Sequence, residues 1–485
     1  MAIKGLVSHY NENRTRTYQA TEEQCEKVIL TAFDILEKIG MKVMDPDARA
    51  LLEQAGCTCE DDLVKVPRES VIKAVELAPS HIDIYDRNGK KVMDVGGTNV
   101  YFGTGPTNPF VNDFETKERR QSKVSDVALS TKVSDALDNI EFIMNLADPA
   151  DCEVDINDVY SMREMLKNTT KPIMCLAVSE ESLSEQFEMA CAVTGGEDKF
   201  REKPFVMSLC GDPITPLALP DAASKKLIFC ARHGIPLTCP SGVQMGTTGP
   251  VSLPTAVALG LAENFLCLVL TEAAEAGAAY MGGIVVLEAD MRTMASCYSL
   301  PTHCISEQMV ADIYHYLDLP LLGTCSSDAK IVDSQLVMEN CFNIYSAALD
   351  GGHLSHDIAF MDSALTTDLD ALTVCDEIIR YARMAASGTT YEDEDFAFDV
   401  LEEVGPQGEF LTSEHTLDNL GKMSRIGLFE HRQFQVWQAD GSKTFIDRAH
   451  EKTEKILKEH VPEALPDDVL KQIDAILNKS VKRVS

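Results

Sequence analysis

Short apolar runs alternate with longer amphipathic stretches from about residue 99 onward. Stretches such as INDVYSMREMLKN and DAASKKLIFCARHG carry apolar residues at helical spacing and end at Asn or Gly. The short runs between such stretches have the length and composition of buried strands. There are eight runs, at residues 99–103, 142–146, 172–178, 205–210, 236–239, 279–287, 320–325 and 353–360.

Eight consecutive units of a strand followed by a helix predict an α/β fold. The number eight favours a closed (β/α)8 barrel of the TIM type over residues 99–386. An open, doubly wound parallel sheet produces the same alternation, so it stays as the alternative fold.

The segments on either side of this region have different patterns. Residues 1–98 combine helical stretches with a hairpin signal, HIDIYDRNGKKVMDV, in which Asn88 and Gly89 suit a tight turn. Residues 387–485 are mainly helical and charged. We expect an N-terminal α+β extension and a C-terminal helical extension that packs on the barrel.

The composition limits the classes of partner. The chain has 485 residues and a formal net charge of −34 at pH 7. Such a surface repels phosphate backbones and anionic membranes, so we expect neither nucleic acid nor a membrane as a partner. A small cationic ligand would be attracted.

The cysteines and the N-terminus bear on location. The number of cysteines is odd, 15, and many lie inside apolar runs, which is typical of reduced thiols rather than a disulfide framework. The first residues, MAIKGLVSHYNENR, lack the apolar core of a signal peptide, and no uncharged apolar run reaches the ~18 residues of a membrane span. We expect a cytoplasmic protein.

In barrel enzymes, the loops that follow the strands build the active site, so these loops hold the candidate residues. The aromatic candidates are Tyr101, Phe102, Phe110, Tyr280 and Phe360, and the acidic candidates are Asp113, Glu288, Asp290 and Asp328. Aromatic faces and carboxylates together favour binding of an alkylammonium, with roughly 0.5–2 kcal/mol for each good ring contact. The alternative for each aromatic residue is ordinary core packing.

Other chemistries have weaker signals. The segment GTGPTN lacks the form of a phosphate-binding loop. Cys57 with Cys59, and His303 with Cys304 and Cys325, do not form a convincing zinc pattern, so we expect no metal. Lys330 follows a predicted strand and would suit a Schiff base, but Asp328 beside it favours an ion pair instead.

Several segments together resemble the trimethylamine methyltransferase family. They are FGTGPTNPFVNDFETKERR at 102–120, EADMRTM at 288–294, SSDAKIVDSQ at 326–335, HLSHDIAFMDSAL at 353–365 followed by VCDEI, and VGPQGEFLTSEHT at 404–416. The resemblance implies a barrel that passes a methyl group from a methylated amine to the cobalt of a separate corrinoid protein. The trimethylamine enzymes carry pyrrolysine, which this chain lacks, so the chain is more similar to betaine methyltransferases that act on quaternary amines.

This resemblance implies a substrate and a partner. Glycine betaine is the favoured substrate, and proline betaine, carnitine and butyrobetaine remain open. The corrinoid is expected on a partner protein, because no D-x-H-x-x-G segment is found here. We also expect a homo-oligomer.

His356 is the first choice to bind the substrate carboxylate, and Arg292 is the second. Their alternatives are a hydrogen-bonded core histidine and an ion pair with Glu288 or Asp290. Asp328 and Lys330 are expected at the floor or rim of the pocket. Two other functions stay open: a Schiff-base lyase or aldolase that uses Lys330, and a quaternary-amine binding protein without catalysis.

Overall fold

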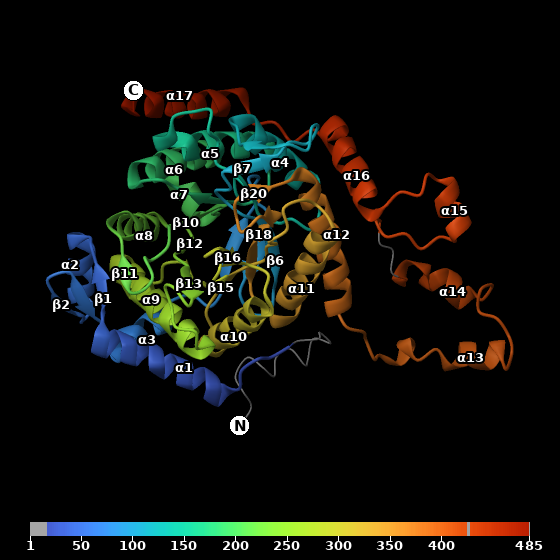
Figure 1. The fold of residues 1–485 in the computed structure, drawn as a ribbon, viewed down its shortest axis with the longest axis horizontal. Coiled ribbons are helices and arrows are strands. Elements are labelled where there is room, and N and C mark those ends of the chain that lie inside the picture. Colours follow the sequence, from blue (N-terminus) through green and yellow to red (C-terminus); the bar gives the residue numbers. More distant parts are fainter. Residues whose placement is uncertain (1–16, 424–426, 485) are drawn as a thin grey trace.

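The computed structural model describes residues 17–423 and 427–484. The expectation of no signal peptide rests on the first fourteen residues, which lie outside this part. The fold is mixed α/β (Figure 1). Seven of the eight predicted runs contain parallel strands: β6 (Tyr101–Thr104), β9 (Ile173–Leu176), β10 (Val206–Leu209), β12 (Leu237–Thr238), β14 (Tyr280–Met281), β17 (Leu322–Thr324) and β18 (Leu354–Ile358).

The runs pair in sequence order. Strands β9, β10, β12 and β14 form one parallel sheet, and β17, β18 and β6 form another. The second run forms single parallel bridges to its neighbours, Gly103 to Phe142 and Ile143 to Ile173. A further bridge joins Gly282 to Leu321. The eighth run therefore lies beside the first, and the runs between them are linked one to the next.

A long helix follows each run before the next run begins, as the alternating pattern predicts, and a second, short helix, α7 (Glu197–Glu202), follows the one after the third run. The long helices are α4 (Val124–Ala136), α5 (Asn157–Asn168), α6 (Glu180–Thr194), α8 (Asp221–His233), α9 (Leu253–Ala274), α10 (Pro301–Leu317), α11 (Ser334–Asp350) and α12 (Leu369–Ala386). Capping side chains mark the starts of three of these helices. Ser179, Asp333 and Asp368 each accept a backbone hydrogen bond from the first turn of the helix that they precede.

The N-terminal region covers one side of the molecule. It contains α1 (Glu22–Asp34), a short π-helix at Ile35–Ile39, β1 (Met41–Val43), α2 (Pro46–Gln54), β2 (Thr58–Glu60), β3 (Leu63–Lys65) and α3 (Arg68–Leu77). The antiparallel pair β4 (Ile82–Tyr85) and β5 (Lys91–Val95) is the predicted hairpin. Gly89 in its turn has a φ of 80°, which glycine adopts without strain.

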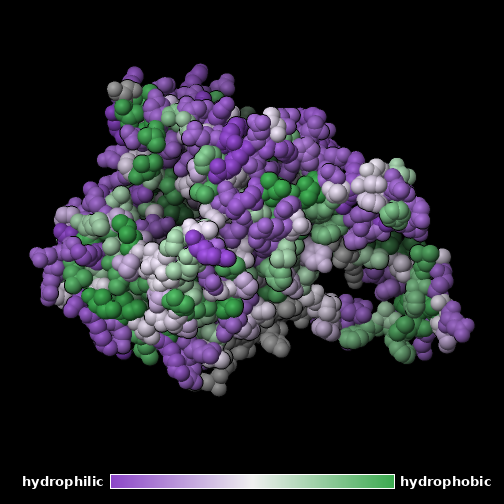
Figure 2. All heavy atoms as spheres, in the orientation of Figure 1, coloured by the Kyte–Doolittle hydropathy of each residue, from purple (hydrophilic) through white to green (hydrophobic). Residues whose placement is uncertain are grey.

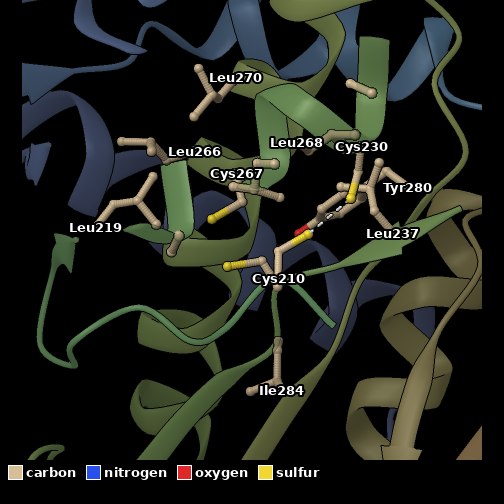
Figure 3. Packing of buried hydrophobic residues seen from close by; sticks show 14 of the residues in the cluster. Cys210, Leu219, Cys230, Leu237, Leu266, Cys267, Leu268, Leu270, Tyr280 and Ile284 are labelled. Carbon is tan, nitrogen blue, oxygen red and sulfur yellow. Dashed lines mark hydrogen bonds between the residues drawn. The ribbon is translucent and has the colours of Figure 1, made fainter. Parts of the chain in front are cut away.

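The helix α9 lies at the centre of the largest hydrophobic cluster. It has 22 residues and is long and apolar enough to cross a membrane, but 83% of its most apolar window is buried inside the fold. Helices α1, α2, α3 and α8 pack against it. Figure 3 shows Leu266, Cys267, Leu268 and Leu270 of this helix among the side chains of neighbouring strands. We therefore assign α9 as a core helix.

All fifteen cysteines are free thiols, and most are buried. Cys210 and Cys230 lie with sulfur atoms 3.7 Å apart beside Tyr280 in the same cluster (Figure 3). Burial raises the pKa of the Cys175 thiol to about 12, so this side chain behaves as a small hydrophobic group. The expectation of reduced, buried thiols agrees with this arrangement.

The C-terminal region has two parts. Helices α16 (Phe445–Glu459) and α17 (Asp467–Val484) pack on the body, α16 against α12 and α4, and α17 against α5 and α6. Between α12 and α16 the chain forms the short helices α13 (Phe398–Val404), α14 (Glu414–Asn419) and α15 (Phe434–Ala439), which project from the body (Figure 1).

Candidate active site

The candidate site lies where several parallel strands end. Thr324 is the last residue of β17, His356 and Asp357 lie near the end of β18, and Asp212 follows β10 by three residues. Tyr298 reaches the same region from the loop before α10. The carboxyl ends of parallel strands are the usual position of active sites in α/β enzymes.

His356 and Asp357 form a buried pair. Nδ1 of His356 lies 2.6 Å from Oδ1 of Asp357, and both side chains are less than a tenth exposed. The Thr324 hydroxyl donates a hydrogen bond to Oδ2 of Asp357. Asp357 of β18 is therefore held by a hydroxyl from the neighbouring strand β17.

Asp212 combines two properties. Its side chain is exposed to solvent, yet protein surrounds it closely enough that burial raises the pKa of the carboxyl to about 6. Among the nearby charges, His356 lowers this pKa and the Asp357 carboxylate raises it. Solvent thus reaches the Asp212 side chain, although protein atoms surround most of the carboxyl group.

A second observation points to open space in the same region. Gly242 follows β12, the strand that pairs with β10, and it is exposed although it lies in β13 (Ser241–Met245). A Cβ atom added at Gly242 would have no neighbour within 4 Å. The space beside the ends of β10 and β12 is therefore large enough to admit a small molecule's methyl or methylene group.

Gly105 has the opposite environment. A Cβ atom there would lie 2.3 Å from the Phe360 ring and 2.4 Å from Oδ1 of Asp357. These distances are too short for any real Cβ, so only glycine allows the ring and the carboxylate to approach the end of the first strand. Gly105 thereby brings Phe360 and Asp357 together.

Asp328 connects two loops at this end of the molecule. Its carboxylate accepts hydrogen bonds from the backbone N–H groups of Tyr298 and Ser299, at 3.2 and 3.0 Å, and from the Ser363 hydroxyl at 3.3 Å. Burial raises the pKa of Asp328, while the two backbone N–H groups lower it. The Asp328 side chain thus fixes the loop that carries Tyr298.

Tyr298 itself is half-buried. Burial raises the pKa of its phenol, and the carboxylates of Asp357, Asp212 and Asp328 raise it further. The hydroxyl therefore stays protonated and can donate a hydrogen bond to a substrate.

Lys330 lies on the surface beside the same loop. Its side chain is 65% exposed, and Nζ lies 2.9 Å from Oδ1 of Asp362 and donates to the carbonyl of Asp328 at 2.8 Å. The carboxylate that pairs with Lys330 is thus that of Asp362 rather than that of Asp328. A charged, paired ammonium is a poor nucleophile for a Schiff base.

Three predicted aromatic residues lie away from this group. Tyr101 is the first residue of β6, and its hydroxyl accepts a hydrogen bond from the Asp94 N–H. Phe102 is fully buried beneath the guanidinium of Arg383, and Tyr280 is buried with its hydroxyl donating to the carbonyl of Asn264. Each of these three side chains thus has a contact within the fold, and their roles in substrate binding stay predictions.

Phe110 and Glu288 lie in the strands β7 (Phe110–Asn112) and β15 (Ile284–Ala289), and Arg292 lies in the loop after β15. Phe110 stacks against the guanidinium of Arg119 at 3.7 Å, and Glu288 accepts a hydrogen bond from Thr302. The Arg292 side chain is 92% exposed and lies 3.7 Å from Asp290. Of the predicted site residues, the structure therefore groups Asp328, His356 and Phe360. Their roles in binding stay predictions.

Asp212, Tyr298, Thr324, Asp357 and Gly105 are not among the site residues predicted from the sequence. Asp212 follows the fourth apolar run in the segment SLCGDP, so the rule that strands end at the site could have found it. Tyr298 follows the short antiparallel strand β16 (Ser296–Cys297), which is not one of the eight predicted runs, so the rule does not reach it. Among residues 17–423 and 427–484, no three His, Cys, Asp or Glu side chains gather as a metal-binding set.

Comparison with known proteins identifies the family. Residues 3–484 match the family model of trimethylamine methyltransferase (MTTB), so the chain belongs to that family. The resemblance seen in the sequence is confirmed, and the protein is a methyltransferase.

Its relatives include trimethylamine and betaine enzymes. The chain is 28% identical to the trimethylamine methyltransferase MttB of Desulfitobacterium hafniense, over 95% of this chain and 93% of that protein. It is 26% identical to a glycine betaine methyltransferase from the same species, over 96% and 97% of the two chains. It is 27% identical to MttB of Methanosarcina barkeri, over 99% of each chain. The crystal structure of the Methanosarcina barkeri monomethylamine methyltransferase MtmB aligns over 98% of this chain and 97% of its own, with a TM-score of 0.49 and 11% identity.

Proposed function

We propose that the protein is a quaternary amine:corrinoid methyltransferase built on a closed (β/α)8 barrel. In this proposal it transfers a methyl group from a quaternary amine, with glycine betaine favoured, to Co(I) of a separate corrinoid protein in the cytoplasm. The return of the parallel pairing from β18 to β6 supports the barrel. The Asp357 carboxylate raises the pKa of Asp212, so the two acidic side chains lie within electrostatic range of each other near the strand ends. Two carboxylates in this region, with open space at Gly242, support a cationic substrate.

The charge of a quaternary nitrogen explains why few catalytic groups are needed. As the carbon–nitrogen bond breaks, its electron pair stays on nitrogen and a neutral tertiary amine leaves. The methyl carbon forms its new bond with the electron pair that Co(I) supplies. Because the leaving group is already neutral, no acid is required, and the protein's task is to hold and aim the methyl group.

The site residues suit this task. Asp212 and Asp357 would attract the ammonium, and Phe360 would offer a ring for its methyl groups. His356 would bind the substrate carboxylate through a ring N–H, and the Tyr298 hydroxyl is a second donor. Since positive charge on the substrate is lost along the reaction path, a cavity with little water favours the reaction.

The other predicted residues would contribute less directly. Asp328 would shape the pocket through the loop that carries Tyr298. Lys330, Glu288 and Arg292 would lie on the rim, where the partner protein must approach. Tyr101, Phe102, Phe110 and Tyr280 would support the strands and loops around the pocket.

Demethylation of individual substrates tests the proposed function. The purified chain is mixed with cob(I)alamin as a free acceptor and with glycine betaine, proline betaine, carnitine or butyrobetaine in turn. Methylation is followed by the change in cobalt absorbance, and trimethylamine is the tertiary-amine control. Methylation with a betaine but not with trimethylamine is expected. Turnover of trimethylamine alone, or of none of these compounds, would overturn the proposal.

A further inference from the structure

The segment 388–421, called the arm below, leaves the body after α12 and contains no buried residue. Both of its ends are attached to the body. Ala386 at the end of α12 is buried, and so is Leu428, whose N–H donates to the Glu377 carboxylate at 3.2 Å. The arm is thus a long projecting segment whose two ends are anchored on the body (Figure 1).

The composition of the arm is unusual for a solvated loop. Tyr391, Phe396, Phe398 and Leu411 are 71%, 64%, 67% and 78% exposed. Figure 2 shows hydrophobic residues on the projecting part of the molecule. Flexible linkers and disordered segments are poor in aromatic residues, because such side chains gain free energy when they are buried. The arm therefore has the composition of a segment that is covered in its working state.

A matching apolar surface lies on the body. Met338, Phe342 and Tyr345 are 59%, 67% and 41% exposed and follow one another at helical spacing on α11. Tyr381 and Met384, on the neighbouring α12, are 52% and 37% exposed. These five side chains, called the receiving surface below, are exposed although the chain's own arm is present.

We propose that the arm of one copy of this chain covers the receiving surface of a second copy, and that the two copies exchange arms reciprocally. Every copy carries both surfaces, so a reciprocal contact closes as a two-fold dimer without leaving either surface unpaired. The proposal is independent of the substrate of the enzyme.

The available area fits a stable dimer. With about 200 Å² for each large aromatic side chain, the exposed parts of Tyr391, Phe396, Phe398 and Phe410 amount to roughly 500 Å². Two arms and the two surfaces that receive them would together bury roughly 2,000 Å². Stable interfaces bury about 1,200–2,000 Å² in total.

Charge opposes this contact and provides a signature. The arm carries ten acidic residues and no Lys or Arg, and the whole chain has a net charge of −34. Two copies therefore repel each other at long range, and apolar burial must outweigh this repulsion. Because salt screens the repulsion and leaves the apolar contact, the dimer is expected to tighten as ionic strength rises.

The experiment measures the mass of the full-length chain in solution by analytical ultracentrifugation, across concentrations and at two salt concentrations. The wild type is expected to have twice the mass of one chain, with tighter association at high salt. Phe398→Ser on the arm and Phe342→Ser on the receiving surface are each expected to raise the dimer Kd at least tenfold. Val461→Ser, which removes an 84% exposed apolar side chain elsewhere, is the matched control and should leave the Kd unchanged.

Mixing the two variants gives the decisive result. A dimer of one Phe398→Ser chain and one Phe342→Ser chain has one intact contact and one doubly altered contact, whereas each variant alone has two altered contacts. A second substitution in a contact that the first has already weakened costs little more, because the effects of neighbouring residues do not add. Mixed samples are therefore expected to associate more tightly than either variant alone. A monomeric wild type would overturn the proposal, and this is also the result expected if the arm folds onto α11 and α12 of its own chain. A dimer that neither variant weakens, or a mixture with no recovery, would overturn it as well.

Discussion

Nδ1 of His356 lies 2.6 Å from Oδ1 of Asp357, although the two residues are neighbours in the chain. Consecutive residues of a regular strand point to opposite faces. Here the pairing of β18 with β6 shifts register between Ser355 and Ile358, and Asp357 has a φ of 67°. This irregularity turns both side chains toward the same space, as β-bulges beside active sites commonly do.

Replacement of His356 should weaken binding of carboxylated substrates. In the His356→Ala variant, we expect KM for glycine betaine to rise about 10–100-fold, because a charge-assisted hydrogen bond contributes ~1.5–3 kcal/mol. Steady-state kinetics of cobalt methylation would measure the change. Tetramethylammonium, which has no carboxylate, should be affected less than threefold, and an equal loss for both substrates would contradict a role in carboxylate binding. His431→Ala, which replaces an exposed histidine away from the site, is the control and should leave KM unchanged.

Two glycines at the site should respond differently to alanine. Gly105→Ala places a methyl group against Phe360 and Asp357, so we expect a loss of ~1–3 kcal/mol in the free energy of unfolding. Gly242→Ala meets nothing within 4 Å and should leave stability unchanged within ~0.5 kcal/mol. Denaturant unfolding of both variants measures this difference. Equal destabilisation by the two substitutions would refute the packing described at Gly105.

Asp212 should make substrate binding depend on pH. Its pKa is raised to about 6, so the fraction that carries a negative charge grows as the pH rises through 6. We expect the affinity for a quaternary amine, measured by calorimetry, to increase over the same range. Asp368 also has a pKa of about 6, so the Asp212→Asn variant is needed to assign the effect. If the variant kept the full pH dependence, Asp212 would not be the responsible group.

The same pKa shift predicts a change in stability. Because the folded-state pKa of Asp212 is above the ordinary value of 3.8, the fold favours the protonated form and loses stability as the pH rises from about 4 to 6. Relative to the wild type, Asp212→Asn should therefore be more stable above pH 6 than it is near pH 4. Thermal unfolding at both pH values tests the sign of this effect.

Substitution of Lys330 separates two chemistries. We expect Lys330→Gln to keep methyl transfer within about threefold, because the ammonium is exposed and paired with Asp362. Borohydride treatment with carbonyl compounds should leave no adduct on Lys330 of the wild type. A trapped adduct, together with complete loss of activity in the variant, would instead favour a Schiff-base enzyme.

The sequence predicts the order of strands and helices well because hydrophobic periodicity depends on local burial. It also predicts which loops to inspect, since Asp328, His356 and Phe360 follow directly from the positions of strand ends. It cannot separate Phe102 and Tyr280, which are buried in the core, from rings that line a pocket, because both environments are apolar. The sequence also could not show that the Asp357 side chain points into the site. The bulge in β18 breaks the alternation of side chains from which the facing of strand residues is predicted.

The burial of α9 beneath α1, α2 and α3 has a consequence for how the protein must be made. The stacked rings of Phe33 and Phe265 join segments that are far apart in the chain. During synthesis, the N-terminal helices leave the ribosome long before α9 does. The helices that cover α9 are therefore already available when this apolar helix emerges. A chain that began at residue 99 would release it unprotected, and we expect such a fragment to aggregate rather than accumulate as a working enzyme.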